Sequence, residues 1–161
     1  MSSTKVIVFK VGNEEYVIDI FKVQSIERMQ DVTAIPNSSP ALIGVTNIRG
    51  EVLPLFDLHK ILTLKEVENT DNTRIILVES QGKTLGVVVD EASEVLEISH
   101  DIIQQPSFTV SEDSFIKGVA TLEARMLIVL DIEKLLSNDN VSADVEKLQA
   151  FIHEGLMEES V

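Results

Sequence analysis

Three aspartates are the residues of this chain whose type and spacing come nearest to catalytic chemistry. Asp57, Asp90 and Asp131 each follow an apolar run of strand character, and paired carboxylates can act as a general acid and a general base. Asp57 and Asp131, however, each precede a short helical segment, where a carboxylate caps the helix by accepting backbone N–H bonds. We therefore expect these two to cap helices. An enzyme, for instance a hydrolase, would require all three carboxylates to converge in one pocket.

Other signatures of catalysis or ligand binding are missing from the sequence. There is no glycine-rich phosphate loop, no nucleophile elbow and no zinc-protease motif. The absence of cysteine excludes disulfides, thiolate metal sites and cysteine nucleophiles. The three histidines, His59, His100 and His153, lie far apart, and we expect His59 to be solvated or to cap a helix. We predict no enzymatic activity, no cofactor and no metal site.

The charge balance narrows the range of partners. The 161 residues include 13 Lys and Arg against 27 Asp and Glu, a formal net charge of −14. Nucleic acids and anionic membranes both select clustered basic residues, so neither is expected as a partner. No stretch approaches the ~20 apolar residues of a membrane span, and no signal peptide is recognisable. The sequence predicts a soluble cytoplasmic protein of one domain or two very small ones.

The elements that would position any site are short strands joined by tight turns. Turn signals at Gly12-Asn13, Arg49-Gly50 and Gln81-Gly82 separate alternating apolar segments. Short helical segments are expected at residues 58–62 and 132–136, and residues 21–27 also shift toward helical spacing. The predicted strands cover residues 5–11, 15–20, 43–48, 51–57, 74–78, 85–89, 94–98, 116–122 and 126–131.

The strand pattern is repeated within the chain. Residues 42–62 align without a gap on residues 116–136, with matched Gly, Asp and Lys positions, and the segments before them align at a slightly different offset. We predict two similar β units, residues 5–68 and 74–136, and strand exchange between them stays open. Closing each unit into a small five-stranded barrel removes unpaired strand edges. The fold class is therefore mainly all-β, with two barrels that share a hydrophobic seam ending in a surface groove.

The C-terminal residues 138–161 have a different pattern. Val141, Val145, Leu148 and Ile152 follow the spacing of one helix face, and most charges in this segment are acidic. We predict an amphipathic helical tail. Its role is left open between a helix docked on a barrel and a helix that binds a partner.

Arg49 stands at the tip of a predicted hairpin, where the turn itself does not require arginine. The equivalent residues of the repeat are Glu123 and Ala124, so the hairpin can form without Arg or Gly. Arg49 is one of four arginines in an acidic chain. It is either a solvated side chain or an ion-pair and interface anchor, a role in which arginine is enriched.

The residues around Arg49 resemble a known family. The stretch from Gly44 to Leu58 reads GVTNIRGEVLPLFDL and is similar to the signature of CheW-type coupling proteins of bacterial chemotaxis. Further matches in the same order lie around residues 15–24, 85–90 and 125–136. The resemblance therefore covers residues 5–136 and implies that residues 1–137 form one domain of two SH3-like barrels.

The resemblance also implies a function. Such proteins are non-catalytic adaptors that bridge the cytoplasmic tips of transmembrane chemoreceptors to a CheA-type histidine kinase. Receptor tips dock in the groove between the barrels, and the regulatory domain of the kinase packs end to end against a barrel. An adaptor of another chemosensory pathway, such as surface motility, would carry the same fold and motif.

The resemblance assigns two sets of contact residues. The residues that match receptor-coupling positions are Val23, Ile26, Asn47, Arg49, Gly50, Gly86 and Val87. The residues expected toward the kinase-contacting end of a barrel are Leu42, Ile43 and Gly44.

The chain departs from the family at one position that matters for Arg49. Many members have a glutamate directly after Val-Gln, where it can pair with the arginine of the motif, and this chain has Ser25 there. The charge partner of Arg49 is left open between Glu27, Glu51 and a carboxylate of the partner protein.

Overall fold

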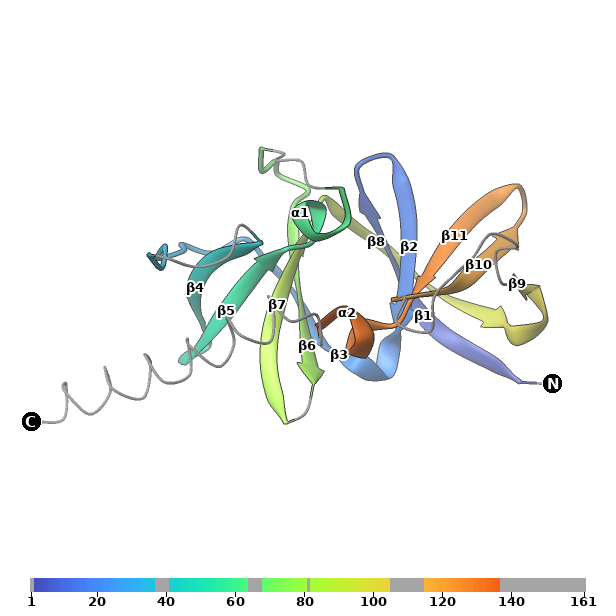
Figure 1. Ribbon diagram of the computed structural model, residues 1–161, viewed down its shortest axis with the longest axis horizontal. Helices are drawn as coiled ribbons and strands as arrows, with labels where there is room; N and C mark the ends of the chain where they lie inside the picture. Colours follow the sequence, from blue (N-terminus) through green and yellow to red (C-terminus); the bar gives the residue numbers. More distant parts are fainter. Residues whose placement is uncertain (1, 37–40, 64–67, 81, 105–114, 137–161) are drawn as a thin grey trace, which may run out of the picture.

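The computed structural model describes residues 2–36, 41–63, 68–80, 82–104 and 115–136, so the predicted tail lies outside the described residues. Within these residues the chain forms short strands, two short helices and two 3-10 turns (Figure 1). The elements are β1 (Ser3–Val11), β2 (Glu14–Asp19), η1 (Ile20–Lys22), β3 (Val23–Arg28), β4 (Leu42–Ile48), β5 (Glu51–Asp57), α1 (Leu58–Thr63), β6 (Arg74–Ser80), β7 (Lys83–Val89), β8 (Glu91–Ser99), η2 (His100–Ile102), β9 (Ile103–Gln104), β10 (Ile116–Leu122), β11 (Arg125–Leu130) and α2 (Ile132–Leu136).

The strands form two sheets, each of which closes into a small barrel, so the predicted mainly all-β fold class is confirmed, although the second sheet has six strands where five were expected. Barrel 1 has the strand order β3-β6-β7-β5-β4, and a bridge between Thr33 and Val45 joins the segment after β3 to β4. Barrel 2 has the order β8-β1-β2-β11-β10-β9, and β9 continues from β8 through η2. The two barrels lie side by side (Figure 1). Closure shortens the unpaired strand edges, which lowers the risk of edge-to-edge aggregation.

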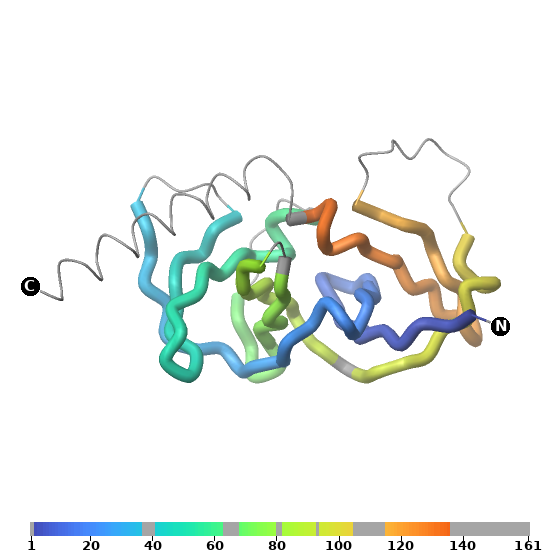
Figure 2. The backbone as a smooth tube through the Cα atoms, turned by 90° about the horizontal axis from the view of Figure 1, so that it is seen from below, coloured from blue at the N-terminus to red at the C-terminus, as the bar shows by residue number. Residues whose placement is uncertain are grey.

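Each barrel is built from both halves of the chain. The β1–β2 hairpin pairs with β8 and β11 of the C-terminal half, and the β6–β7 hairpin pairs with β3 and β5 of the N-terminal half. Figure 2 shows the chain passing between the barrels from β2 to β3 and again from β7 to β8. Side-chain contacts support both crossings: Lys22 Nζ lies 3.2 Å from Glu133 Oε1, and Asp90 accepts the N–H of Gly12 at 2.6 Å.

Apolar side chains form three clusters. Barrel 1 encloses Ile48, Leu53, Leu55, Ile75, Leu77 and Val88. Barrel 2 encloses Val6, Val8, Val17, Ile98, Ala120, Leu127 and Val129. The largest cluster lies between the barrels and includes Phe9, Tyr16, Phe56, Leu58, Ile76 and Val87. Strands β1, β2, β6 and β7 therefore have buried residues on both faces, as the apolar runs in β1, β6 and β7 suggest.

The repeated segments have matching structures. Strands β4 and β5 with α1 correspond to β10 and β11 with α2, and in both hairpins the register shifts beside a glycine, Gly44 or Gly118. A Cβ on Gly44 would collide with the backbone of Thr33, and a Cβ on Gly118 would lie 2.8 Å from the carbonyl oxygen of Gln104. Glycine is required at both positions because another segment of backbone crosses there to close the barrel.

One expectation about secondary structure is wrong. Residues 21–27 were expected to shift toward helical spacing, because Val23 and Ile26 are three residues apart, but they form the end of η1 and most of β3. Strand β3 pairs Val23 with Val78 and Ile26 with Ile76, and its register shifts between Val23 and Ser25. This β-bulge adds one residue, so two apolar side chains with helix-like spacing share one face of a strand.

Candidate functional site

The β4–β5 hairpin ends in a two-residue loop that carries Arg49. Ile48 and Glu51 form the last pair of the ladder, and Arg49 and Gly50 both have positive φ, 54° and 87°. This is the type I′ geometry that matches the twist of the flanking strands. The side-chain carbonyl Oδ1 of Asn47 accepts the N–H of Gly50 at 2.9 Å. The turn is therefore fixed both by strand pairing and by a side chain.

Arg49 pairs with Glu27 of strand β3, one of the three partners that the sequence left open. Its Nη2 atom lies 2.7 Å from Glu27 Oε1, and the arginine side chain is 74% exposed while that of Glu27 is 15% exposed. The hydroxyl of Ser25 donates to the same Glu27 oxygen at 3.4 Å. Residues 25 and 27 are two apart on a strand and so share a face. Glu27 therefore provides the carboxylate that pairs with Arg49, in place of the glutamate that many members of the resembling family have at position 25.

The apolar residues predicted beside this pair differ in exposure. Val23 is partly buried against the cluster between the barrels, whereas Ile26 is 40% exposed. Val52 on β5, opposite Asn47 in the ladder, is also 40% exposed. Val52 was not predicted as an exposed residue, because the continuous apolar run of residues 52–56 does not indicate which of its side chains face outward.

Gly86 and Val87 were predicted as receptor-coupling positions, and the structure buries both. Val87 is fully buried between the barrels. Gly86 faces the interior of barrel 1, where a Cβ would lie 2.8 Å from a methyl carbon of Ile75. Neither residue can make a side-chain contact with a partner as the chain stands. Both residues are in the interior, on strand β7, which lies between β6 and β5 in the sheet of barrel 1.

The residues expected toward the kinase lie at the opposite end of strand β4 from Arg49. Leu42 is buried in the cluster between the barrels, and Gly44 lies against Val32 and Thr33 with φ +153°. Ile43 is partly buried and packs against the interior of barrel 1. β4 is the last strand of its sheet, and among the described residues its outer edge pairs only at Val45. Ile43 and this edge are the accessible features of the set.

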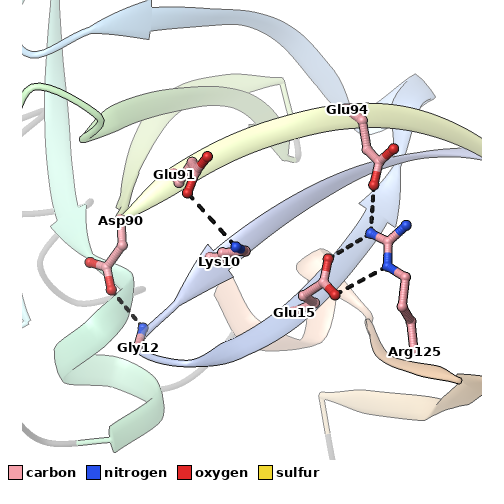
Figure 3. A network of polar contacts seen from close by, with 7 residues as sticks. All are labelled: Lys10, Gly12, Glu15, Asp90, Glu91, Glu94 and Arg125. Atoms are coloured by element: carbon pink, nitrogen blue, oxygen red, sulfur yellow. Dashed lines mark hydrogen bonds and ion pairs between the residues drawn. The ribbon is translucent and has the colours of Figure 1, made fainter.

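The three aspartates are bound to backbone N–H groups. Asp57 Oδ1 accepts from the N–H of His59, and Asp131 Oδ1 accepts from the N–H of Lys134, so both cap short helices as predicted. Burial raises the pKa of Asp57, although the backbone N–H groups of Lys60 and His59 oppose the shift. Asp90 accepts instead from Gly12 in the crossing to β8 (Figure 3). Among the described residues no group of three or more acidic or histidine side chains could hold a metal ion.

One of the two expectations for His59, a solvated side chain, is wrong, and the other, a helix cap, stays a prediction. The residue is buried instead of solvated, at 6% exposure, and its Nε2 atom lies 3.8 Å from Asp90 Oδ2. The cause is the position of α1 against the crossing between the barrels, which the local sequence does not reveal.

A second arginine network lies in barrel 2. Figure 3 shows Arg125 of β11 between Glu15 of β2 and Glu94 of β8. The pair with Glu15 is bidentate, with nitrogen–oxygen distances of 2.6 Å and 3.2 Å. The hydrogen bond from Arg125 lowers the pKa of Glu15, and the two carboxylates raise that of Arg125. This network joins three strands, whereas the ion pair described for Arg49 involves one carboxylate, that of Glu27.

Comparison with known proteins agrees with this architecture. A CheW-like domain matches residues 5–140. The chain is 39% identical over 138 residues to the chemotaxis protein CheW of Klebsiella aerogenes, covering 84% of this chain and 83% of that protein. It is 36% identical over 143 residues to the chemotaxis protein CheW of Bacillus subtilis, covering 88% and 92%.

A solved structure has the same fold. The crystal structure of the scaffolding protein TtCheW from Thermoanaerobacter tengcongensis superposes with a TM-score of 0.76 at 28% identity, covering 87% of this chain and 92% of that one. None of the helices described here is both long enough and apolar enough to cross a membrane. The matched residues include both barrels and the Arg49 hairpin, and the chain belongs to the CheW family.

Proposed function

We propose that this chain is a non-catalytic adaptor that couples transmembrane chemoreceptors to a CheA-type histidine kinase in chemotaxis signalling. Its place would be in the cytoplasm, recruited to membrane-bound receptor arrays. Family membership and the scaffolding name of a structural relative support this function. The capping roles of Asp57 and Asp131 agree with an adaptor without catalysis.

The proposed receptor contact is the Arg49 hairpin with the adjacent face of strand β3. The observation that carries it is an arginine held at a tight turn, 74% exposed, with one carboxylate contact in the part of the chain that the structure describes. A guanidinium has five N–H donors, so Arg49 keeps donors for acceptors of a docked receptor. Val23, Ile26 and Gly50 complete the surface, Asn47 belongs to the hairpin that forms it, and Gly86 and Val87 support it from the interior.

The proposed kinase contact is the beginning of strand β4. Ile43 offers apolar surface there, and the edge of β4 offers backbone N–H and C=O groups to another sheet. A regulatory domain with a matching apolar strand could extend the sheet, because main-chain bonds supply affinity and alternate side chains supply specificity. Leu42 and Gly44 would set the position of this edge through packing.

The receptor contact is tested by comparing Arg49→Ala with Glu123→Ala at the equivalent turn of barrel 2. Both residues have positive φ, 54° and 48°, so the two substitutions place similar demands on the backbone. We expect Arg49→Ala to bind a soluble receptor-tip fragment about 30-fold more weakly, as for an interface anchor worth about 2 kcal/mol. Glu123→Ala should bind as the parent chain does. Equal affinities of Arg49→Ala and the parent chain, both folded by circular dichroism, would contradict the proposal.

A further inference from the structure

The turn that presents Arg49 is supported by the side chain of Asn47. Asn47 was predicted to touch the receptor itself, yet its Oδ1 atom accepts the N–H of Gly50 at 2.9 Å. This bond spans the two residues between Asn47 and Gly50, including Arg49. Arg49 has φ +54°, a conformation that residues with a side chain rarely adopt. The Oδ1 atom of Asn47 therefore stabilises the backbone of this turn.

The equivalent turn of barrel 2 shows which features of the hairpin form without an asparagine at the position of Asn47. Glu123 and Ala124 have φ values of 48° and 67°, so the same backbone forms there. The residue equivalent to Asn47 is Thr121, which pairs with Met126 as Asn47 pairs with Val52. In the described part of the chain Thr121 makes no hydrogen bond to Ala124. The hydrogen bond from Gly50 N–H to the Asn47 side chain is therefore a feature of the β4–β5 hairpin, which carries the exposed arginine, and not of the equivalent hairpin.

The added bond matters because Arg49 has few other restraints. Its side chain is 74% exposed and has Glu27 as its charge partner, so its direction depends on the backbone from which it starts. A long side chain that is already directed at its partner loses less freedom on binding. A small change in the turn would move the guanidinium away from Glu27 and from any docked acceptor.

We propose that Asn47 is a positioning residue for Arg49: its side-chain carbonyl holds Gly50 and so directs Arg49 toward Glu27 and the docked receptor, and Asn47 acts through Arg49 without contacting the receptor. This inference rests on the proposed receptor contact. It replaces the direct contact expected of Asn47 with an intramolecular role.

The first measurement uses the free protein. Amide hydrogen exchange followed by NMR should show the Gly50 N–H exchanging faster in Asn47→Ala than in the parent chain, with the exchange of Ala124 unchanged. Asn47→Asp keeps an acceptor oxygen and should retain the protection of Gly50. Unchanged exchange of Gly50 in Asn47→Ala would overturn the inference, whatever partner the chain binds.

The second measurement is affinity for a soluble receptor-tip fragment. Asn47→Ala should bind about fivefold more weakly, the loss expected for one hydrogen bond, and Asn47→Asp should restore most of the affinity. The double variant Asn47→Ala with Arg49→Ala should bind no more weakly than Arg49→Ala alone. The matched control Thr121→Ala should bind as the parent chain does.

Two results would overturn the inference without touching the proposed function. One is a double variant whose losses add, since that would mean an independent contact by Asn47. The other is loss of affinity in Asn47→Asp although Gly50 stays protected, since the amide nitrogen would then contact the receptor. If Arg49→Ala binds the receptor-tip fragment as the parent chain does, the proposed receptor contact is wrong. The hydrogen-exchange data then still show whether Asn47 holds the turn.

Discussion

The two hairpin tips of this molecule have the same backbone and different side chains. The β4–β5 tip consists of Arg49 and Gly50, and the β10–β11 tip consists of Glu123 and Ala124, all four with positive φ. Type I′ turns favour glycine or asparagine, so two successive residues with side chains at the second tip are unusual. Their presence shows that strand pairing on both sides is sufficient to impose this turn.

The arginines near the two tips are used in different ways. Arg125 begins strand β11, is 32% exposed and binds two carboxylates, Glu15 and Glu94, from two other strands. Arg49 lies in the tip, is 74% exposed and, among the described residues, pairs with one carboxylate, that of Glu27. A bidentate arginine shared by two carboxylates is held in one geometry, whereas an exposed single pair contributes little to stability. Arg125 therefore serves the fold, and Arg49 is available for a partner.

The comparison separates positions that both barrels need from positions that only one uses. Gly44 and Gly118 both permit closure, and Asp57 and Asp131 both cap a short helix, so these pairs serve the fold. Arg49 differs from its equivalent residue and is not needed to form the turn. Differences of this kind, at exposed positions within a duplicated fold, are where a binding function is expected.

The largest expected effect is on stability, at the glycines that close the barrels. Gly44→Ala should lower the free energy of unfolding by about 3 kcal/mol, because a Cβ would collide with the backbone of Thr33 at a positive φ. Gly118→Ala should cost less, about 1–2 kcal/mol, because its Cβ would meet the carbonyl oxygen of Gln104 at 2.8 Å and a side-chain methyl group of Ile103 at 2.9 Å, without the strain of positive φ. Urea unfolding of both variants measures the difference. A larger loss of unfolding free energy for Gly118→Ala than for Gly44→Ala would contradict the interpretation that the backbone approaches more closely at Gly44.

A smaller effect is expected at the residues beside these glycines. Ile43 of β4 is equivalent to Lys117 of β10, so Ile43→Lys gives barrel 1 a residue that barrel 2 already accommodates. We expect Ile43→Lys to weaken binding of the kinase regulatory domain about tenfold, because an apolar contact is lost, and to leave receptor binding unchanged. Lys117→Ile is the control and should leave both affinities unchanged. Full kinase affinity of a folded Ile43→Lys variant would contradict the assignment of this barrel end.

The smallest effect is on the pH dependence of stability, where one carboxyl group from each barrel should act with opposite sign. Arg125 holds the pKa of Glu15 below its ordinary value, so the stability from Glu15 is present above that ordinary value and is lost as the pH falls through the folded pKa. Burial raises the pKa of Asp57, so its ionised form lowers stability at neutral pH and this cost is relieved as the pH falls through the folded pKa.

Urea unfolding between roughly pH 7 and pH 3, the range in which carboxyl groups titrate, tests this contrast. On acidification the parent chain should lose stability relative to Glu15→Gln and gain stability relative to Asp57→Asn. Shifts of the same sign for the two variants would show that the two carboxyl groups do not differ in the way described.

Local signals in the sequence predicted much of the fold. The turn residues at Gly12 and at Arg49-Gly50 marked hairpins that the structure contains, and the helix at residues 132–136 has the expected bounds. Other features depend on distant parts of the chain. Pairing of β1 with β8 joins residues about ninety positions apart, which local alternation does not encode. The bulge in β3, which gives Val23 and Ile26 their helix-like spacing, also depends on pairing with a distant strand, β6.

The candidate site was predicted in part. The hairpin and Arg49 followed from the repeat and the family resemblance, but the sequence left three charge partners for Arg49, and only the positions of β3 and β4 in one barrel select Glu27. The burial of Val87 was not foreseen, because the family resemblance assigned this residue to the receptor contact, whereas both faces of β7 are covered in the structure. Asn47 was recognised as part of the motif, but its bond to Gly50 could be seen only with the turn in place.

Kinase activity in a reconstituted assembly tests the central claim most directly, namely that Arg49 serves coupling and its equivalent serves only the turn. The assembly contains a receptor-tip fragment, a CheA-type kinase and this chain as the parent, Arg49→Ala or Glu123→Ala. The account predicts that the parent chain and Glu123→Ala make kinase activity depend on the receptor, whereas Arg49→Ala does so only at much higher protein concentration. Equal coupling by Arg49→Ala and the parent chain at limiting concentration would contradict it.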